Sequence, residues 1–238
     1  FGHTLIRDTM KGLEKNISLR FHFDDAKLLL KEGSSPGNLL QGFTKCPAPG
    51  TDAKMATTVV NHLFAIGDDP LGFDLMALNI QRGRDHGISG YTAWRKACRL
   101  SPIEDFGGLV DIMPEDVIKT FHHLYWHVQD IDLFPAAIAE FPVEDGILGP
   151  TLTCLIGQQF SYLMHGDRFW HERPTQPKPF TDAQLSHLRQ QSLSSLLCKT
   201  TEMEELQPNP FLMVDAESNP LKKCSSYPKL NLLAWKTL

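Results

Sequence analysis

The residues best suited to chemistry stand in one short stretch, which contains two guanidinium groups, a carboxylate, an imidazole and two glycines: Arg82, Arg84, Asp85, His86, Gly83 and Gly87. Guanidinium groups bind carboxylates through paired hydrogen bonds, and an imidazole can bind a metal or carry a proton. A purely structural loop rarely needs so many such groups. The structural alternative is a helix that ends at Gly83 and enters a charged surface turn.

Histidines elsewhere give a weaker indication of a metal site. His122 and His123 are adjacent and would point about 100° apart on a helix, so they cannot easily face one ion. His123 and His127 are four positions apart and could face one ion, but no cysteine or carboxylate stands at a matching position. A lone histidine such as His3 is more often a packed or surface residue than a ligand. These patterns alone therefore do not favour zinc.

Apolar spacing and capping residues predict the elements that position these groups. A short strand is expected at residues 19–23, where side chains alternate. Helices are expected over residues 52–66, 91–100, 114–125, 150–164 and 181–198. The segment 150–164 has the clearest pattern of a buried helix. Helices thus outnumber strands among the elements that these local patterns predict.

Composition bounds the class of protein. The chain has 238 residues, with 42% hydrophobic and 21% charged side chains, which suits one substantial core. A formal net charge of -5 and a pI near 6.0 argue against a nucleic-acid partner, which usually requires a basic face. No apolar run reaches the roughly 18 residues of a membrane span. The chain opens on Phe1, so it is interpreted as a fragment or a processed chain, and a missing leader says nothing about secretion.

Five cysteines are spread along the chain at positions 46, 98, 154, 198 and 224. None form a close Cys-x-x-Cys pair of the kind that binds zinc or carries redox chemistry. Widely spaced cysteines in a domain of this size are compatible with buried thiols or with disulfides. Asn16-Ile17-Ser18 is a glycosylation sequon, which matters only if the chain is secreted.

Four segments together resemble the signatures of the animal haem peroxidase superfamily. They are Leu78–Gly87, Phe1–Ile6, Asp130–Phe134 followed by Gly149-Pro150-Thr151, and Gly166–Trp170. Their order along the chain and their spread over most of it make chance agreement improbable. The resemblance implies a mainly α, multi-helix fold that is incomplete at its N-terminus. Residues 1–238 would form the C-terminal part of one haem peroxidase domain.

The resemblance also assigns roles to residues of this sequence. His3 would be the proximal axial ligand of the iron of haem b, and the Asn79 side chain would hold the far ring nitrogen of that imidazole. Arg82 would pair with a haem propionate. Arg84, Asp85 and His86 would be structural ion-pair and hydrogen-bond partners.

The implied activity is oxidation of a small reducing substrate by hydrogen peroxide. In this superfamily the distal histidine and arginine, and the calcium loop, precede the proximal histidine. No catalytic residue is therefore expected in this chain, and the N-terminal half of the same domain would be its partner. A peroxidase-like adhesion or matrix scaffold with little turnover is the alternative.

The superfamily resemblance implies an extracellular, oxidising location. It also implies two disulfides, Cys98–Cys154 and Cys198–Cys224. Cys46 is then left over, either free or bonded to a partner outside this chain.

Overall fold

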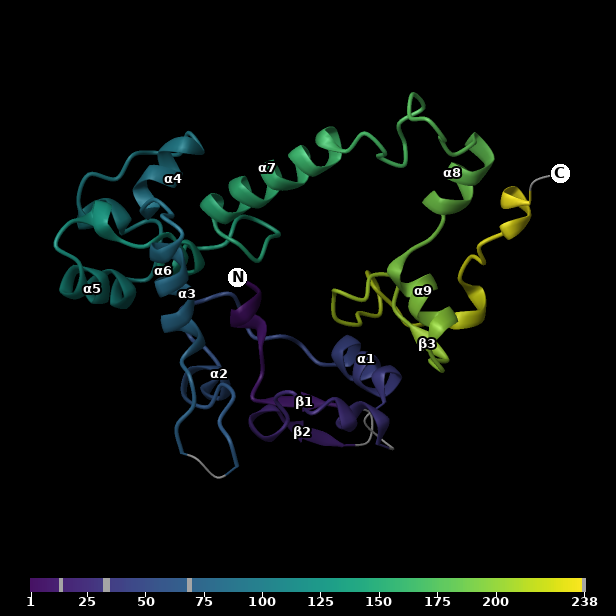
Figure 1. The fold of residues 1–238 in the computed structure, drawn as a ribbon, viewed down its shortest axis with the longest axis horizontal. Coiled ribbons are helices and arrows are strands. Elements are labelled where there is room, and N and C mark those ends of the chain that lie inside the picture. The colour runs from purple at the N-terminus through teal and green to yellow at the C-terminus, as the bar shows by residue number, and fades with distance from the viewer. Residues whose placement is uncertain (13–14, 32–34, 68–69, 237–238) are drawn as a thin grey trace. The chain divides into compact units, whose positions relative to one another are not determined.

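The computed structural model describes residues 1–12, 15–31, 35–67 and 70–236 (Figure 1). They form two compact units. The first comprises Phe1–Asp8, Ser18–Asp24 and Ala48–Ser161, and the second comprises Thr9–Ile17, Asp25–Pro47 and Tyr162–Leu238. Helices dominate both units and the strands are short, which confirms the predicted fold class. Across the described residues, no helix is both long and apolar enough to cross a bilayer.

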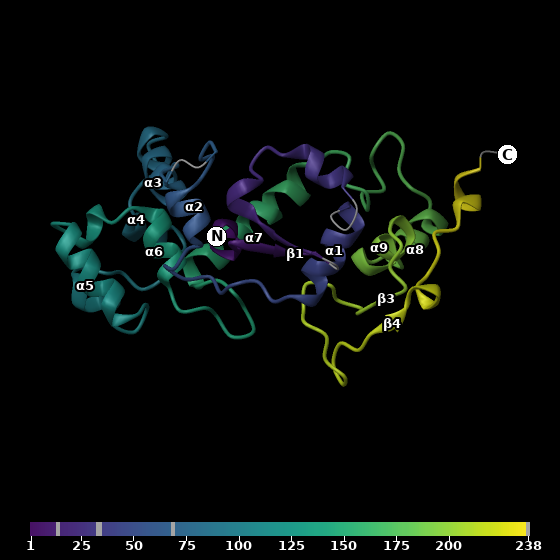
Figure 2. The same ribbon diagram turned by 90° about the horizontal axis from the view of Figure 1, so that it is seen from below.

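The first unit is built from helices around one apolar core. Its helices are α2 (Thr57–Asn61), α3 (Leu75–Asp85), α4 (Tyr91–Ala97), α5 (Glu115–Leu124), α6 (Leu133–Ala139) and the start of α7 (Pro150–Gly166). Short 3-10 turns lie at Gly2–Leu5, Leu19–Phe21, Phe106–Leu109 and Val128–Asp130. α6 packs against both α3 and α4, and both views show it beside them (Figures 1 and 2). The core is formed by fully or nearly buried side chains, including Tyr91, Leu109, Met113, Ile131 and Ala136.

The second unit combines short helices with two small sheets. Its elements are β1 (Thr9–Lys11), β2 (Asn16–Ser18), α1 (Pro36–Lys45), α8 (Asp182–Arg189), α9 (Leu193–Thr200), β3 (Glu205–Leu206) and β4 (Lys222–Lys223). β1 pairs with β2, and β3 pairs antiparallel with β4. α1 lies along β1 (Figure 2), and Gly42 of α1 is required there because a Cβ would collide with the backbone of Lys11. Turns at Ala26–Leu30, Cys224–Ser226 and Leu232–Trp235 complete the unit.

Local capping signals correctly predict where two helices begin. α5 starts directly after Pro114 and carries Glu115 and Asp116 in its first turn, where carboxylates favour the positive end of the helix dipole. α8 starts after Thr181, whose hydroxyl accepts from the Gln184 backbone N–H at 3.3 Å while the Gln184 side chain accepts from the Thr181 N–H at 2.9 Å. This reciprocal pair is the capping box that the sequence predicts.

The predicted helix over residues 52–66 is wrong in extent, because only Thr57–Asn61 is helical. Asp52 caps a local turn instead, accepting from the Lys54 N–H at 2.7 Å. The first turn of α2 is capped by Asp8, which accepts from the Thr58 N–H at 2.7 Å. The chain then leaves the helix so that Leu63 can pair with Phe73. The true cap lies 50 positions away in the sequence, which a local pattern cannot reveal.

Two further boundaries differ from expectation. Residues 19–23 form a 3-10 turn at Leu19–Phe21 rather than a strand, because the His22 N–H bonds back to the Leu19 carbonyl at 3.0 Å. The helix expected over residues 181–198 is two helices, α8 and α9. Ser192 breaks it by capping α9 through the Ser195 N–H at 3.1 Å.

The expectation of a buried helix at 150–164 is half right. α7 forms as predicted, but Thr151 is its only buried residue among those described. Phe160 is 67% exposed and Leu163 is 55% exposed. Helical spacing reports an apolar face and says nothing about what packs on that face.

The helix α1 was not expected from the sequence. Its start is marked by Ser35, whose hydroxyl accepts from the Asn38 N–H at 3.4 Å, and by proline at the first helical position. Those two residues are a recognisable helix start, so the signal was present.

Candidate functional site

The stretch that carries the chemical groups is a helix that continues through Gly83 to Asp85. Asp74 caps α3 by accepting from the backbone N–H groups of Met76 and Ala77 at 2.8 and 3.1 Å. The helix ends at Asp85, and Gly87 just beyond it has a φ of +65°, the left-handed conformation that favours glycine after a helix end. The structural alternative, in which Gly83 ends the helix, is therefore wrong.

α3 forms one wall of a pocket of about 280 Å³ in the first unit. Asn79 and Gly83 are four residues apart and so share the helix face that lines this pocket. The opposite wall comes mainly from α6 and the residue before it. The lining residues are Phe1, Asn79, Ile80, Gly83, Ile88, Asp132, Leu133, Phe134, Ala137, Ile138 and Leu152. The pocket is thus mostly apolar, with one amide and one carboxylate among its described side chains.

Asn79 is half-buried and contributes that amide. Its Nδ2 group donates to the backbone carbonyl of Leu75, one turn earlier in α3. This bond fixes the rotation of the amide. Within the described residues the Oδ1 atom accepts no hydrogen bond, so it is available to an N–H donor.

His3 lies in the 3-10 turn at the start of the chain and is exposed. The turn is held by Thr4, whose N–H and hydroxyl both donate to the Phe1 carbonyl at 2.9 and 2.8 Å. Phe1 reaches the pocket, whereas His3 is not part of its lining. Among the described residues, the His3 imidazole has no hydrogen-bond partner.

Arg82 also lies outside the pocket lining, on an exposed face of α3. No described residue pairs with its guanidinium. Its backbone carbonyl accepts from His86, whose ring Nδ1 lies 2.9 Å away. The structure therefore brings Asn79 to the pocket and leaves His3 and Arg82 beyond its wall.

Arg84 makes the strongest contact of the α3 stretch. Its Nε donates to Asp132 Oδ1 at 3.0 Å and its Nη2 donates to Oδ2 at 2.6 Å. Tyr125 donates its hydroxyl to the same Oδ2 at 2.8 Å. The hydrogen bonds from Arg84 hold the pKa of Asp132 below its usual value, and burial together with Asp132 raises the pKa of Tyr125. Arg84 was expected to form a structural ion pair, and Asp132 is its partner.

Comparison with known proteins identifies the family. The sequence model described as animal haem peroxidase matches residues 1–211. The chain belongs to the animal haem peroxidase family.

Curated family relatives align along nearly the whole chain. A peroxidase-like protein of Margaritifera margaritifera is 36% identical over 98% of this chain and 32% of its own length. Lactoperoxidase of Mus musculus is 35% identical over 100% of this chain and 34% of its own length. Peroxidasin of Drosophila melanogaster is 31% identical over 99% of the chain and 16% of its own length. The chain therefore spans about a third or less of these relatives.

A solved structure shows the same fold. Peroxidase A from Dictyostelium discoideum superimposes with a TM-score of 0.70 at 23% identity, covering 92% of this chain and 40% of that protein. A fatty acid alpha-dioxygenase of Arabidopsis thaliana gives a TM-score of 0.58 at 18% identity, covering 71% of this chain and 29% of that one. At these identities the likeness concerns the fold alone.

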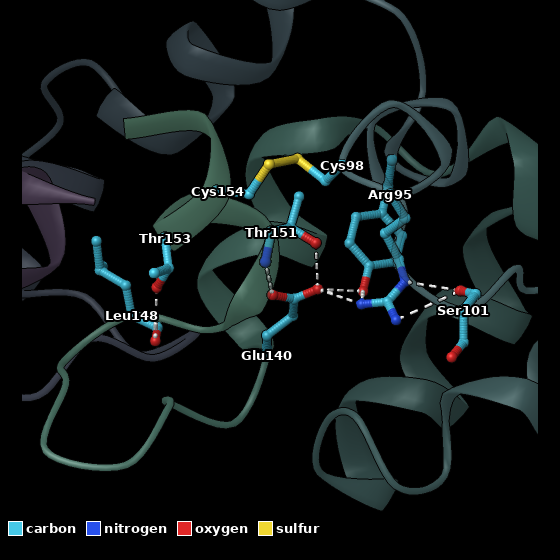
Figure 3. A network of polar contacts seen from close by, with 9 residues as sticks. Arg95, Cys98, Ser101, Glu140, Leu148, Thr151, Thr153 and Cys154 are labelled. Atoms are coloured by element: carbon cyan, nitrogen blue, oxygen red, sulfur yellow. Dashed lines mark hydrogen bonds and ion pairs between the residues drawn. A yellow bond between two sulfur atoms is a disulfide. The ribbon is translucent and has the colours of Figure 1, made fainter. Parts of the chain in front are cut away.

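Sequence reasoning missed the most deeply buried charged residue among those that the structure describes. Glu140, which directly follows α6, is 3% exposed. Its polar contacts are shown in Figure 3. Its Oε1 accepts from the Tyr91 hydroxyl at 2.6 Å, from Arg95 Nη1 at 2.8 Å and from the Thr151 hydroxyl at 2.5 Å. Its Oε2 accepts from the Thr151 N–H at 2.8 Å. We call these four residues the Glu140 cluster.

The Glu140 cluster joins three helices. Tyr91 and Arg95 come from α4, Glu140 follows α6, and Thr151 lies in the first turn of α7. Burial is the main cause that raises the pKa of Tyr91, with its hydrogen bond to Glu140 second. Gly149 leaves room for the cluster, since a Cβ there would collide with the Glu140 side chain. A lone acid at the end of the apolar run 134–141 was the available signal for a buried carboxylate.

Both expected disulfides form. Cys98 at the end of α4 bonds Cys154 in α7, beside the Glu140 cluster (Figure 3). Cys198 in α9 bonds Cys224 after β4. Cys46 is free among the described residues. The pairing that the family resemblance implies is confirmed.

Proposed function

We propose that this chain supplies the proximal side of the haem site of a peroxidase, with His3, Asn79 and Arg82 as the residues that hold haem b. The observation that carries the proposal is Asn79: a half-buried amide at an apolar pocket, with its rotation fixed by the Leu75 carbonyl and its Oδ1 atom unused. An acceptor so placed suits the N–H of an axial imidazole, because such an acceptor selects the tautomer and raises the basicity of the ligand.

The donors present fit a haem group. The pocket wall is apolar, as the face of a porphyrin requires. His3 offers an imidazole without a described partner, and it follows Phe1 of the pocket lining by two residues. Arg82 offers an unpaired guanidinium, whose planar fork suits a propionate carboxylate. When bound, haem supplies an iron centre at which hydrogen peroxide is reduced while a donor is oxidised.

Under this proposal each residue has a separate task. His3 binds the iron, Asn79 holds the His3 ring and strengthens its donation, and Arg82 retains the cofactor by its edge. Asp132 is the one ionisable side chain among the described pocket residues, and it is committed to Arg84.

Acid–base catalysis would come from a distal histidine and arginine outside residues 1–238, carried by another part of the same peroxidase domain. A calcium site would also lie outside this chain. The proposed reaction is oxidation of a small donor by hydrogen peroxide. An extracellular setting is supported by the two disulfides, which persist in oxidising compartments.

Substitution of Asn79 in the native-length, haem-loaded protein tests the proposal. Asn79→Ala should keep haem bound but raise the reduction potential, because the imidazole becomes a poorer donor. Peroxide turnover should fall about 10–100-fold, which is typical when such a supporting hydrogen bond is lost. Asn79→Asp should lower the potential, because a carboxylate is the stronger acceptor.

Gln81→Ala is the matched control, because Gln81 is an exposed neighbour on α3 that does not line the pocket. It should leave the potential and turnover as they are in the wild type. If Asn79→Ala also leaves both unchanged, the assignment of Asn79 is wrong. Wild-type protein that holds haem without peroxide turnover would instead favour the scaffold function.

A further inference from the structure

α3 carries Asn79 but is weakly anchored by packing. No residue of α3 is buried, whereas the facing helix α6 has four consecutive buried residues, Ala136–Ala139. α6 is therefore a firm support. α3 packs against it, and half-buried side chains of α3 such as Asn79 and Ile80 line the pocket beside this contact. A helix held by so few buried contacts can shift on its support at little energetic cost.

The ion pair between Arg84 and Asp132 is a directional contact between these two helices. Arg84 is in the last turn of α3, and Asp132 directly precedes α6. The two hydrogen bonds of 3.0 and 2.6 Å use both carboxylate oxygens, so they fix the angle of approach as well as the distance. Asp132 also lines the pocket, which places this contact beside the space that Asn79 faces.

Tyr125 fixes the carboxylate itself. Its hydroxyl donates to Asp132 Oδ2 at 2.8 Å, and its ring packs against the core of the first unit. The carboxylate thus accepts one donor from the core side and two from α3. Tyr125 thus holds Asp132 from the core side, through a contact that does not involve α3.

We infer that Asp132 is a positioning residue for the haem site: by clamping Arg84, it sets where α3 presents the Asn79 amide to the proximal imidazole. This inference rests on the proposed function of the pocket. Arg84 lies five residues beyond Asn79, about 7.5 Å along the helix axis, so a displacement at the clamp is transmitted along α3 to the amide. The hydrogen bond from the imidazole to Asn79 depends steeply on that position.

Loss of the Arg84–Asp132 pair should have different effects if the pair is purely structural and if it positions Asn79. Arg84 is 58% exposed, and exposed pairs contribute little to stability. Loss of the pair should therefore lower the melting temperature by at most about 4 °C. The electronic properties of the iron should change more clearly, because they depend on the Asn79 contact.

The test uses the native-length, haem-loaded protein and measures the iron–imidazole stretching frequency, the reduction potential and the melting temperature. Asp132→Asn should lower the stretching frequency and raise the potential, both in the direction expected for Asn79→Ala. Asp132→Glu, which keeps the carboxylate, should recover part of the shift. Tyr125→Phe should give a smaller shift of the same sign.

Glu172→Gln is the matched control. Glu172 forms an exposed ion pair with Arg189, whose Nε and Nη2 lie 3.0 and 2.8 Å from Oε1, but it does not line this pocket. It should leave the stretching frequency and the potential at their wild-type values.

Different results overturn the proposed haem-binding function and the positioning role of Asp132. A wild-type spectrum without histidine ligation overturns the proposed function. Wild-type histidine ligation, combined with an unchanged stretching frequency and potential in Asp132→Asn, overturns the positioning role alone. A drop in melting temperature without any change at the iron would also reduce Asp132 to a structural residue.

Discussion

Two arginine–carboxylate pairs in the first unit have similar chemistry and opposite surroundings. In the Glu140 cluster, the side chains of Arg95 and Glu140 are 6% and 0% exposed. At the pocket, the side chains of Arg84 and Asp132 are 58% and 17% exposed. The buried pair is surrounded by partners that satisfy it, while the outer pair bridges two helices at the edge of a pocket. An arginine–carboxylate pair can thus lie inside a core or bridge two helices at the edge of a pocket, and burial distinguishes the two cases.

The largest expected effect is on the buried pair. Glu140→Ala removes the acceptor shared by Tyr91, Arg95 and Thr151, and leaves a buried guanidinium without its charge partner. Breaking a buried pair in this way typically costs about 3–5 kcal/mol. Urea denaturation should show a loss of this size in the free energy of unfolding. A loss below about 1 kcal/mol would mean that the Glu140 cluster contributes little to holding the start of α7 in place.

The Cys98–Cys154 disulfide beside the Glu140 cluster also connects α4 to α7. The double variant Cys98→Ser with Cys154→Ser should lose about 2–4 kcal/mol, because the unfolded chain regains loop entropy. The bridge spans 56 positions, whereas Cys198–Cys224 spans 26, so removal of the second bridge should cost less. Urea denaturation of both double variants would check the order. An inverted order would show that native packing around the bridges outweighs loop length.

The smallest expected effect on stability is at the outer pair. The pKa of Asp132 is lowered in the folded protein, so its stabilising contribution is present above the unfolded value of about 4 and is lost as the pH falls through the folded value. Asp132→Asn should lower stability by less than about 1 kcal/mol near neutral pH. Melting curves should converge with the wild type on acidification. A difference that persists at low pH would contradict an electrostatic origin.

Local sequence signals predicted those features that local interactions determine. The start of α5 after Pro114 and the capping box of Thr181 and Gln184 are set within a few residues. The disulfide pairs followed from family resemblance rather than from spacing. Apolar periodicity indicated individual helices, and the mainly α-helical fold class was implied by the family resemblance.

Features set by distant contacts were not predictable in this way. Asp8 caps α2 from 50 positions away, so the helix begins later than its local pattern indicates. Glu140 gathers partners from α4 and α7, and its neighbours do not reveal them. At the candidate site, the sequence pointed to α3 and Asn79, but the partner of Arg84 became visible only once α6 was placed.

The central claim, that the His3 imidazole is an axial haem ligand, is tested most directly by removing that imidazole and supplying it again. In the native-length protein, His3→Gly should lose the absorbance spectrum of histidine-ligated haem, and added free imidazole should restore it. His123→Ala, which removes an exposed histidine of α5, should keep the wild-type spectrum throughout. A His3→Gly protein that retains a histidine-ligated spectrum without added imidazole would place the axial ligand elsewhere and contradict the account.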